Sequence, residues 1–172
     1  MRLTVDRSWD GALAAPHECV EWDLSVDGEM LSVAVRAHDH GDSQPAVSRG
    51  STDRLWEFEV VELFIAGPGT AYTELEFGPH GHYLVLRLDG VRRVISMHHP
   101  IDYAVQRDGA QWSGRARIPL ALLPERPWRL NAYAIHGAAP RRYLVATPMA
   151  TDQPDFHRPE SFCITWDGLA SA

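Results

Sequence analysis

Residues 55–88 decide the fold, and they read LWEFEVVELFIAGPGTAYTELEFGPHGHYLVLRL. Gly and Pro residues at 67–69 and 78–81 divide this stretch into three segments in which polar and apolar side chains alternate. Alternation with a period of two is typical of β-strands. We therefore predict three antiparallel strands that follow one another as a meander, with aliphatic rows turned into the core.

Short alternating segments continue outward from this stretch along nearly the whole chain. Residues 19–38 form a predicted hairpin, because Asp27-Gly28 is favoured in tight turns and alternating apolar residues flank it. A surface loop is expected over 39–53, and one helical turn over 119–123. The other predicted strands cover 3–5, 92–96, 102–107, 111–118, 128–136, 143–147 and 162–166.

The predicted fold class is all-β. Short strands separated by turn residues indicate an antiparallel β-sandwich, immunoglobulin-like or jelly-roll-like, of about ten strands with at most one short helix. A closed barrel is the alternative. At 172 residues, the chain suits a single domain over residues 1–172.

Composition narrows the classes of partner. The formal net charge of −7 argues against general nucleic-acid binding. The sequence as given has no signal peptide and no apolar run of about 18 residues, so we expect no membrane partner and a cytoplasmic location. Cys19 and Cys163 lack metal-binding spacing and are expected to be reduced, buried thiols, with nothing to indicate whether they lie close together. The sequence gives no oligomeric state.

The candidate site is a charged sheet face in the central stretch. If the aliphatic rows point inward, Glu62, Glu74, Glu76 and Arg87 gather on the opposite face. The bland alternative is a solvated face whose ion pairs contribute little. Aromatic residues nearby in the sequence, such as Trp56, favour a sugar site, because ring faces cover the apolar side of a pyranose while charged groups bind its hydroxyls.

A resemblance to a known family supports this interpretation. Residues 56–64, WEFEVVELF, followed by Tyr72-x-Glu74-x-x-Phe77-x-Pro79-x-Gly81, resemble the signature of family 9 carbohydrate-binding modules and their DOMON-like relatives. Further matches are Ile118-Pro119-Leu120, Trp128-Arg129-Leu130-Asn131 and Phe156-His157-Arg158-Pro159-Glu160-Ser161-Phe162. The uncharacterised bacterial DOMON-like branch is expected to be closest.

The resemblance implies a β-sandwich that clamps a saccharide end between aromatic rings. It assigns stacking to Trp56, an acidic contact to Glu62 and a basic contact to Arg87, while the second stacking aromatic could be Tyr143, Phe156 or His157. Glu59 stands where relatives usually carry aspartate. The predicted ligand-binding set is Trp56, Glu62, Glu74, Glu76, Arg87, Arg129 and His157.

Other chemistries are weaker alternatives. The pairs His38/His40, His80/His82 and His98/His99 each lack the further ligands that zinc usually needs. Haem, which some DOMON relatives bind, is the main alternative, through Met97 or Met149 with His98 or His157. A structural calcium ion at Asp39, Asp42 and Asp53 is a lesser one.

A catalytic role is not expected. Glycoside hydrolysis by Glu74 and Glu76 requires only a spacing that exposed strands commonly show, so we predict no catalytic residue, no metal ligand and no obligatory cofactor. For residues 156–160 a rigid structural turn is favoured over a ligand-contacting rim, because Pro154 and Pro159 restrict the backbone. The expected function is non-catalytic binding of a carbohydrate or other small polar ligand.

Overall fold

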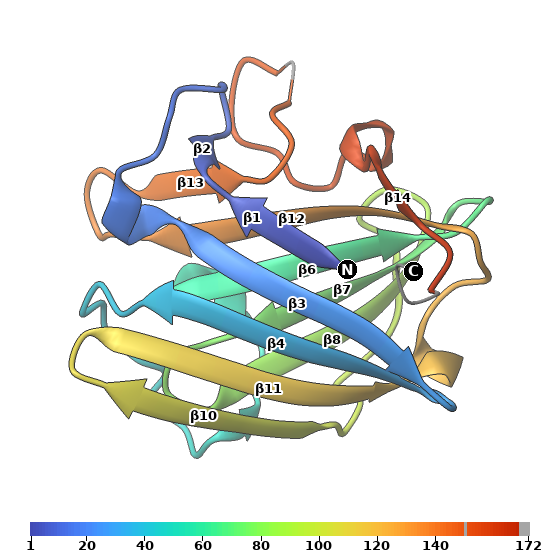
Figure 1. The fold of residues 1–172 in the computed structure, drawn as a ribbon, viewed down its shortest axis with the longest axis horizontal. Helices are drawn as coiled ribbons and strands as arrows, with labels where there is room; N and C mark the ends of the chain where they lie inside the picture. Colours follow the sequence, from blue (N-terminus) through green and yellow to red (C-terminus); the bar gives the residue numbers. More distant parts are fainter. Residues whose placement is uncertain (150, 169–172) are drawn as a thin grey trace.

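The computed structural model describes residues 1–149 and 151–168. Two β-sheets face each other (Figure 1), and the main apolar core lies between them. Nearly all strand pairs are antiparallel. The all-β sandwich predicted from the sequence is confirmed. Fourteen strands are present in the described part of the chain, more than the ten or so expected. The two that were not predicted have two residues each, too few for a periodic pattern: β2 (Arg7–Ser8) and β5 (Gly50–Ser51), of which β5 lies within the loop expected at 39–53.

The first sheet has five strands in the order β1-β3-β4-β11-β10. The predicted hairpin at residues 19–38 is confirmed, with Asp27 paired to Met30 across the turn. Gly28 in this turn has a φ of 58°, a conformation that favours glycine. The strands are β1 (Arg2–Val5), β3 (Val20–Asp27), β4 (Met30–His38), β10 (Asp102–Asp108) and β11 (Gln111–Pro119).

The second sheet follows the order β2-β13-β12-β6-β7-β8-β5, with β14 beside β12 and β9 beside β8. The predicted meander is confirmed as β6-β7-β8 at the centre of this sheet. Among the described strands, the short β5 alone runs parallel to its neighbour, β8. The strands are β2 (Arg7–Ser8), β5 (Gly50–Ser51), β6 (Val60–Ala66), β7 (Ala71–Phe77), β8 (His82–Asp89), β9 (Val94–Met97), β12 (Trp128–His136), β13 (Arg142–Val145) and β14 (Ile164–Trp166).

Short 3₁₀ turns connect the strands. The single helical turn expected at 119–123 is η3 (Leu120–Leu122). Three further turns of the same length were not predicted: η1 (Pro16–Glu18), η2 (Leu55–Glu57) and η4 (Pro159–Ser161). Residues 55–57 therefore precede the first central strand instead of belonging to it. No described helix is long and apolar enough to cross a membrane.

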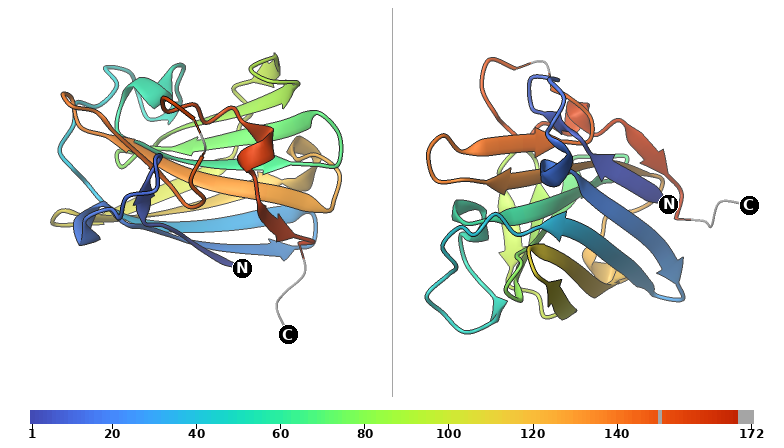
Figure 2. Two further views of the ribbon diagram at one scale, coloured as in Figure 1. Left: turned by 90° about the horizontal axis from the view of Figure 1, so that it is seen from above. Right: turned by 60° about the vertical axis from the view of Figure 1, so that its left-hand side comes forward.

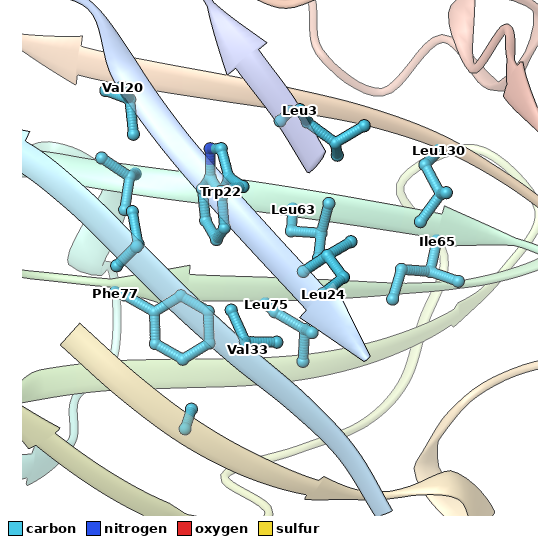
Figure 3. Close-up of a cluster of buried hydrophobic side chains, with 14 of the residues drawn as sticks. Leu3, Val20, Trp22, Leu24, Val33, Leu63, Ile65, Leu75, Phe77 and Leu130 are labelled. Atoms are coloured by element: carbon cyan, nitrogen blue, oxygen red, sulfur yellow. The ribbon is translucent and has the colours of Figure 1, made fainter. Parts of the chain in front are cut away.

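The main core lies between the two sheets. Trp22 and Leu24 from the first sheet meet Leu63, Leu75 and Phe77 from the second, and all are at most 2% exposed (Figure 3). These are the alternate positions that the period-two pattern assigned to the core. Burial of such side chains contributes about 1.5–3 kcal/mol each to folding.

A second apolar layer covers the opposite face of the second sheet. Phe64, Tyr72, Tyr133 and Phe162 are fully buried there although they point away from the main core. Segments around η2 and η4 lie over this face, on the side away from the five-stranded sheet (Figure 2). The central strands are thus buried on both faces, as strands in the middle of layered folds often are.

This second layer overturns one sequence prediction. Leu84, Leu86 and Leu88 were assigned to the main core, which placed Arg87 beside the glutamates. In the structure β7 and β8 pair with Phe77 opposite Tyr83, so Glu74 lies across from Leu86, and Arg87 lies across from Thr73 on the other face. The assignment failed because both faces of β8 are apolar, and alternation alone then does not say which row points inward.

The two cysteines are free thiols. The expectation that they are reduced is confirmed, but the expectation that both are buried is wrong, since Cys163 is exposed and Cys19 half-buried.

Candidate functional site

A pocket of about 310 Å³ opens on the outer face of the second sheet, and we call it the outer pocket. Strands β6, β7, β8 and β12 form its floor, and residues 90–94 and 154–157 contribute to its wall. Its lining is mainly apolar and aromatic, with a few charged groups. It comprises Trp56, Glu62, Phe64, Glu74, Leu86, Leu88, Arg92, Val94, Ile135, Tyr143, Pro154, Asp155, Phe156 and His157.

Three buried carboxyl groups lie on the sheet face that carries this pocket. Glu62 pairs with Glu76 across β6 and β7, and Glu74 is two residues from Glu76 on the same face. Their exposed fractions are 2% for Glu62, 3% for Glu74 and 0% for Glu76. Carboxyl groups so far from water avoid ionisation unless a cation or hydrogen-bond donors compensate the charge.

The environment of the three groups favours their neutral forms. Burial raises the pKa of Glu74 to about 8. Burial, reinforced by the neighbouring glutamates, raises the pKa of both Glu62 and Glu76 well above the usual range. Glu76 lies near Glu74 and the backbone N–H of Trp56, yet neither of its oxygens makes a well-formed hydrogen bond within the described residues.

We call Glu62, Glu74 and Glu76 the acidic floor. His157 lies between this acidic floor and the pocket wall. Its Nδ1 is 2.8 Å from the Tyr72 hydroxyl, and its Nε2 is 3.7 Å from Glu74 Oε2. Burial, with the nearby Arg92, lowers the pKa of His157 to about 4. Near neutral pH a neutral imidazole therefore faces a largely neutral carboxyl group, and the pair is not a salt bridge.

The charged rim of the outer pocket is internally paired. Arg92 Nη2 donates to Asp155 Oδ1 at 2.7 Å, and Arg158 Nε donates to Asp155 Oδ2 at 2.8 Å. The backbone N–H of Arg92 also donates to the Tyr72 hydroxyl at 3.0 Å. These bonds join the turn after β8 to the segment before η4. The Arg92 guanidinium is therefore paired with Asp155, which is not one of the buried glutamates.

Besides the fully buried Phe64, three aromatic side chains line the pocket, and they differ in how far they are buried. Trp56 is 38% exposed, whereas Phe156 is buried and stacks on Tyr133 with ring centroids 4.1 Å apart. Tyr143 meets the edge of Phe156 at 6.0 Å. An exposed tryptophan in a pocket is available to a ligand. The three candidates for a second stacking group, Tyr143, Phe156 and His157, line the same pocket.

Arg141 fixes the turn that carries Trp56. Its guanidinium donates to the carbonyl oxygens of Trp56, Glu57 and Phe58, each at 2.7 Å. The Arg141 side chain therefore holds the backbone of η2 at Trp56 and Glu57, and that of Phe58, the residue after η2. Arg141 also lies close enough to lower the pKa of Glu62 against the effect of burial.

The structure brings together most of the residues predicted from sequence. Trp56, Glu62, Glu74 and His157 line the outer pocket, and Glu76 lies beside them on the same face. The placement of Arg87 with this group is wrong for the reason given above.

Arg129 lies outside the outer pocket as well. It shares the outer face of β12 but donates to the carbonyl oxygens of Pro159 and Gly67, at 3.2 and 3.4 Å. Its guanidinium therefore holds the η4 turn and the β6–β7 connection. Arg158 and Glu160, 3.6 Å apart, pair locally as expected for a structural turn, whereas Phe156 and His157 of the same segment reach the outer pocket.

Sequence reasoning missed Arg92 and Asp155, which shape the pocket rim. Both lie on irregular segments, and Arg92 has a φ of 58°, so strand periodicity assigns them no direction. The 92–96 segment was predicted as one strand, but β9 starts only at Val94. The paired charges of Arg92 and Asp155 could be found only from the three-dimensional structure.

A larger hollow of about 560 Å³ lies against the five-stranded sheet. Its lining combines small residues with charged ones such as Asp23, Arg115 and Arg117. Asp23 already bonds Arg2 at 2.9 Å and Arg36 at 3.4 Å. The hollow is wide and open, and it lacks the buried polar groups and the exposed aromatic ring that mark the outer pocket.

The histidines and loop aspartates take part in other contacts. His40 stacks on His136 with centroids 3.6 Å apart, and His17 and His38 lie within 6 Å of His40. Asp39 binds Arg107, and Asp42 accepts from the backbone N–H of Gly137 at 2.6 Å. Within residues 1–149 and 151–168, no group of three or more His, Cys, Asp or Glu side chains is arranged to hold a metal ion.

Comparison with solved structures assigns the class of fold. A Bacteroides uniformis protein to which carbohydrate binding is attributed matches with a TM-score of 0.74 and 17% identity, over 95% of this chain and 84% of its own. A family 9 carbohydrate-binding module from Caldicellulosiruptor kristjanssonii, solved with glucose, matches with a TM-score of 0.49 and 13% identity, over 83% and 72% of the two chains. The chain shares the β-sandwich fold of the Bacteroides uniformis protein.

Sequence comparison identifies the family. The mouse UPF0462 protein C4orf33 homolog is 33% identical over 94% of this chain and 89% of its own length, and human UPF0462 protein C4orf33 is 30% identical over 94% and 86%. The chain therefore belongs to the UPF0462 family. No family model matches. These relatives are vertebrate proteins and not members of the bacterial DOMON-like branch that was expected, and the DOMON resemblance stays a prediction.

Proposed function

We propose that this protein binds a small polar ligand, most simply one terminal sugar residue, in the outer pocket. The observation that carries the proposal is a pocket in which buried carboxyl groups meet an exposed tryptophan on an otherwise apolar floor. Such pockets orient a ligand through a few polar groups while apolar and aromatic walls supply most of the contact.

The volume of the outer pocket limits the size of the ligand. At about 310 Å³ it lies at the small end of ligand pockets, which usually span about 300–1,000 Å³. A single ring fits this volume better than an extended chain does. The fold of the Bacteroides uniformis protein supports the sugar class at the level of architecture.

The chemistry of the floor also suits hydroxyl groups. A neutral carboxyl group can donate one hydrogen bond and accept others, so Glu62 and Glu74 can bind sugar hydroxyls without leaving an ion buried. The ring face of Trp56 can cover the C–H side of the same sugar. Binding without chemical turnover is the function proposed, and no reaction is assigned to the glutamates.

Calorimetric titration with a panel of monosaccharides tests the proposal. We expect binding of at least one sugar, and its loss in Trp56→Ala and Tyr143→Ala. Leu13→Ala is the matched control, because Leu13 is 73% exposed and lies outside the pocket. Sugar binding that is unchanged in both aromatic variants would show that the sugar site lies outside the outer pocket. Stoichiometric haem uptake with a Soret band, together with no sugar binding, would favour the haem alternative.

A further inference from the structure

The outer pocket has more acidic groups than its own basic groups can neutralise. Arg92 is committed to Asp155, and Arg141 is committed to three backbone carbonyls. His157 uses Nδ1 on Tyr72 and is too poor a base to hold a proton near neutral pH. Among the described residues, no arginine hydrogen bond or ion pair reaches Glu62, Glu74 or Glu76, although the charge of Arg141 lies near Glu62.

Glu62 and Glu74 are nevertheless open to the pocket. Both line it, whereas Glu76 is fully buried, does not line it, and has neither oxygen in a well-formed hydrogen bond within the described residues. Buried carboxyl groups in proteins are normally hydrogen-bonded, paired or protonated. A ligand that brings a hydrogen-bond donor, and above all a positively charged one, can therefore compensate these carboxyl groups.

The aromatic side chains of the outer pocket also favour a cationic ligand. A cation over the face of a tryptophan or tyrosine is attracted by the ring quadrupole, and this attraction grows when water is excluded. Trp56 and Tyr143 therefore accept an ammonium group as readily as the C–H face of a sugar. A ligand carboxylate, by contrast, would meet Glu62 and Glu74 without a free basic partner, so zwitterions such as amino acids are disfavoured.

We propose that the outer pocket selects ligands with a primary ammonium group, and specifically amino sugars with a free amine, over neutral or N-acylated sugars. The inference rests on the proposed sugar-binding function of the same pocket. The ammonium group is placed against Glu62 and Glu74, and the ring is placed against Trp56. N-acetylation removes the charge and adds bulk, and replacement of the amine by hydroxyl removes only the charge.

Titration with glucosamine, glucose and N-acetylglucosamine tests the inference. At about pH 6.5 an amine similar to an α-amino group, with a pKa of about 7.7–8.0, is charged. We expect glucosamine to bind at least tenfold more tightly than either neutral sugar. In Glu62→Gln and Glu74→Gln the ratio of glucosamine affinity to glucose affinity should fall toward one, whatever the change in glucose affinity itself. Glu29→Gln, an exposed turn residue outside the pocket, is the control and should keep the wild-type ratio.

The outcomes separate the two proposals. Equal binding of glucosamine and glucose would overturn the ammonium preference and leave the sugar site intact. If none of the three sugars binds, the sugar proposal fails, and ethanolamine is then titrated as a bare amine probe. Ethanolamine binding that is lost in Glu74→Gln would support the ammonium inference alone, and no binding would overturn it. Circular dichroism of each variant verifies that the fold is kept.

Discussion

Replacing Glu74 by glutamine should stabilise the protein, and increasingly so as the pH rises. Burial raises the pKa of Glu74 from an ordinary 4.5 to about 8, so the folded protein holds a proton that the unfolded chain has already released. A raised pKa contributes stability that is complete below pH 4.5 and is lost as the pH rises through 8. Glutamine has nearly the same shape and cannot ionise.

The magnitude follows from the displacement of this pKa. Each tenfold change in an acid dissociation constant corresponds to about 1.4 kcal/mol, so a rise from 4.5 to about 8 corresponds to about 5 kcal/mol above pH 8. At pH 7 the cost is about 3 kcal/mol, and at pH 4 it is close to zero. Because only 3% of Glu74 is exposed, solvent screens little of this cost.

Urea unfolding followed by tryptophan fluorescence at about pH 4, 7 and 9 measures the effect. The quantity of interest is the free energy of unfolding of Glu74→Gln minus that of the wild type, because other titrating groups then largely cancel. Any constant cost from changed hydrogen bonds also cancels in the pH dependence. Glu29→Gln, at an exposed turn, is measured in parallel as the control variant. A difference that does not change with pH for Glu74→Gln would mean that this carboxyl ionises freely, and the account of a buried, protonated glutamate would be wrong.

Three further predictions concern the scaffold and the pocket wall. The Arg142 guanidinium that binds Glu18 is the main cause that lowers the pKa of Glu18 to about 2. The ionised carboxylate therefore stabilises the fold above pH 4.5, and this stabilisation is lost as the pH falls through 2. Glu18→Gln should lower the free energy of unfolding by about 3 kcal/mol at pH 7, measured by urea unfolding, and by little near pH 2. Gly67→Ala should lower the stability by about 1–3 kcal/mol, because its Cβ would lie 2.8 Å from a backbone oxygen, whereas Gly69→Ala, with nothing within 4 Å, should not. Arg141→Gln should weaken sugar binding in calorimetry about three- to tenfold by loosening the turn that carries Trp56. An unchanged affinity would show that the turn is held by other contacts.

The parts of the fold that were predictable are those in which one face of a strand is clearly apolar. The β3–β4 hairpin follows from the Asp27-Gly28 turn and its alternating flanks, and the β6–β7–β8 order follows from the two Gly/Pro turns. Glu62, Glu74 and Glu76 share a face because the period of a strand requires it once β6 and β7 are paired. These inferences need only local geometry.

The parts that were not predictable depend on contacts between distant segments. Arg87 was misplaced because the second apolar layer made both faces of β8 look like a core face. Arg92 and Asp155 are 63 residues apart in the chain and meet only where two irregular segments cover the sheet. The burial of the glutamates was not predictable either, since alternation gives the face that they share but not the segments that cover it.

The second apolar layer also explains why the glutamates are suited to a charged ligand. Segments that carry Trp56, Arg92 and His157 help to bury the glutamates, and this burial keeps the Glu74 carboxyl largely protonated near neutral pH in the free protein. An ammonium ligand bound there favours the carboxylate, and a proton must then leave to solvent. Binding of glucosamine should release up to about one proton near pH 6.5, whereas glucose should release none. Calorimetric titration in two buffers of different ionisation enthalpy measures this number directly. Equal heats in both buffers for glucosamine would mean that Glu62 and Glu74 stay protonated in the complex, which would contradict the ammonium inference while leaving the sugar site in place.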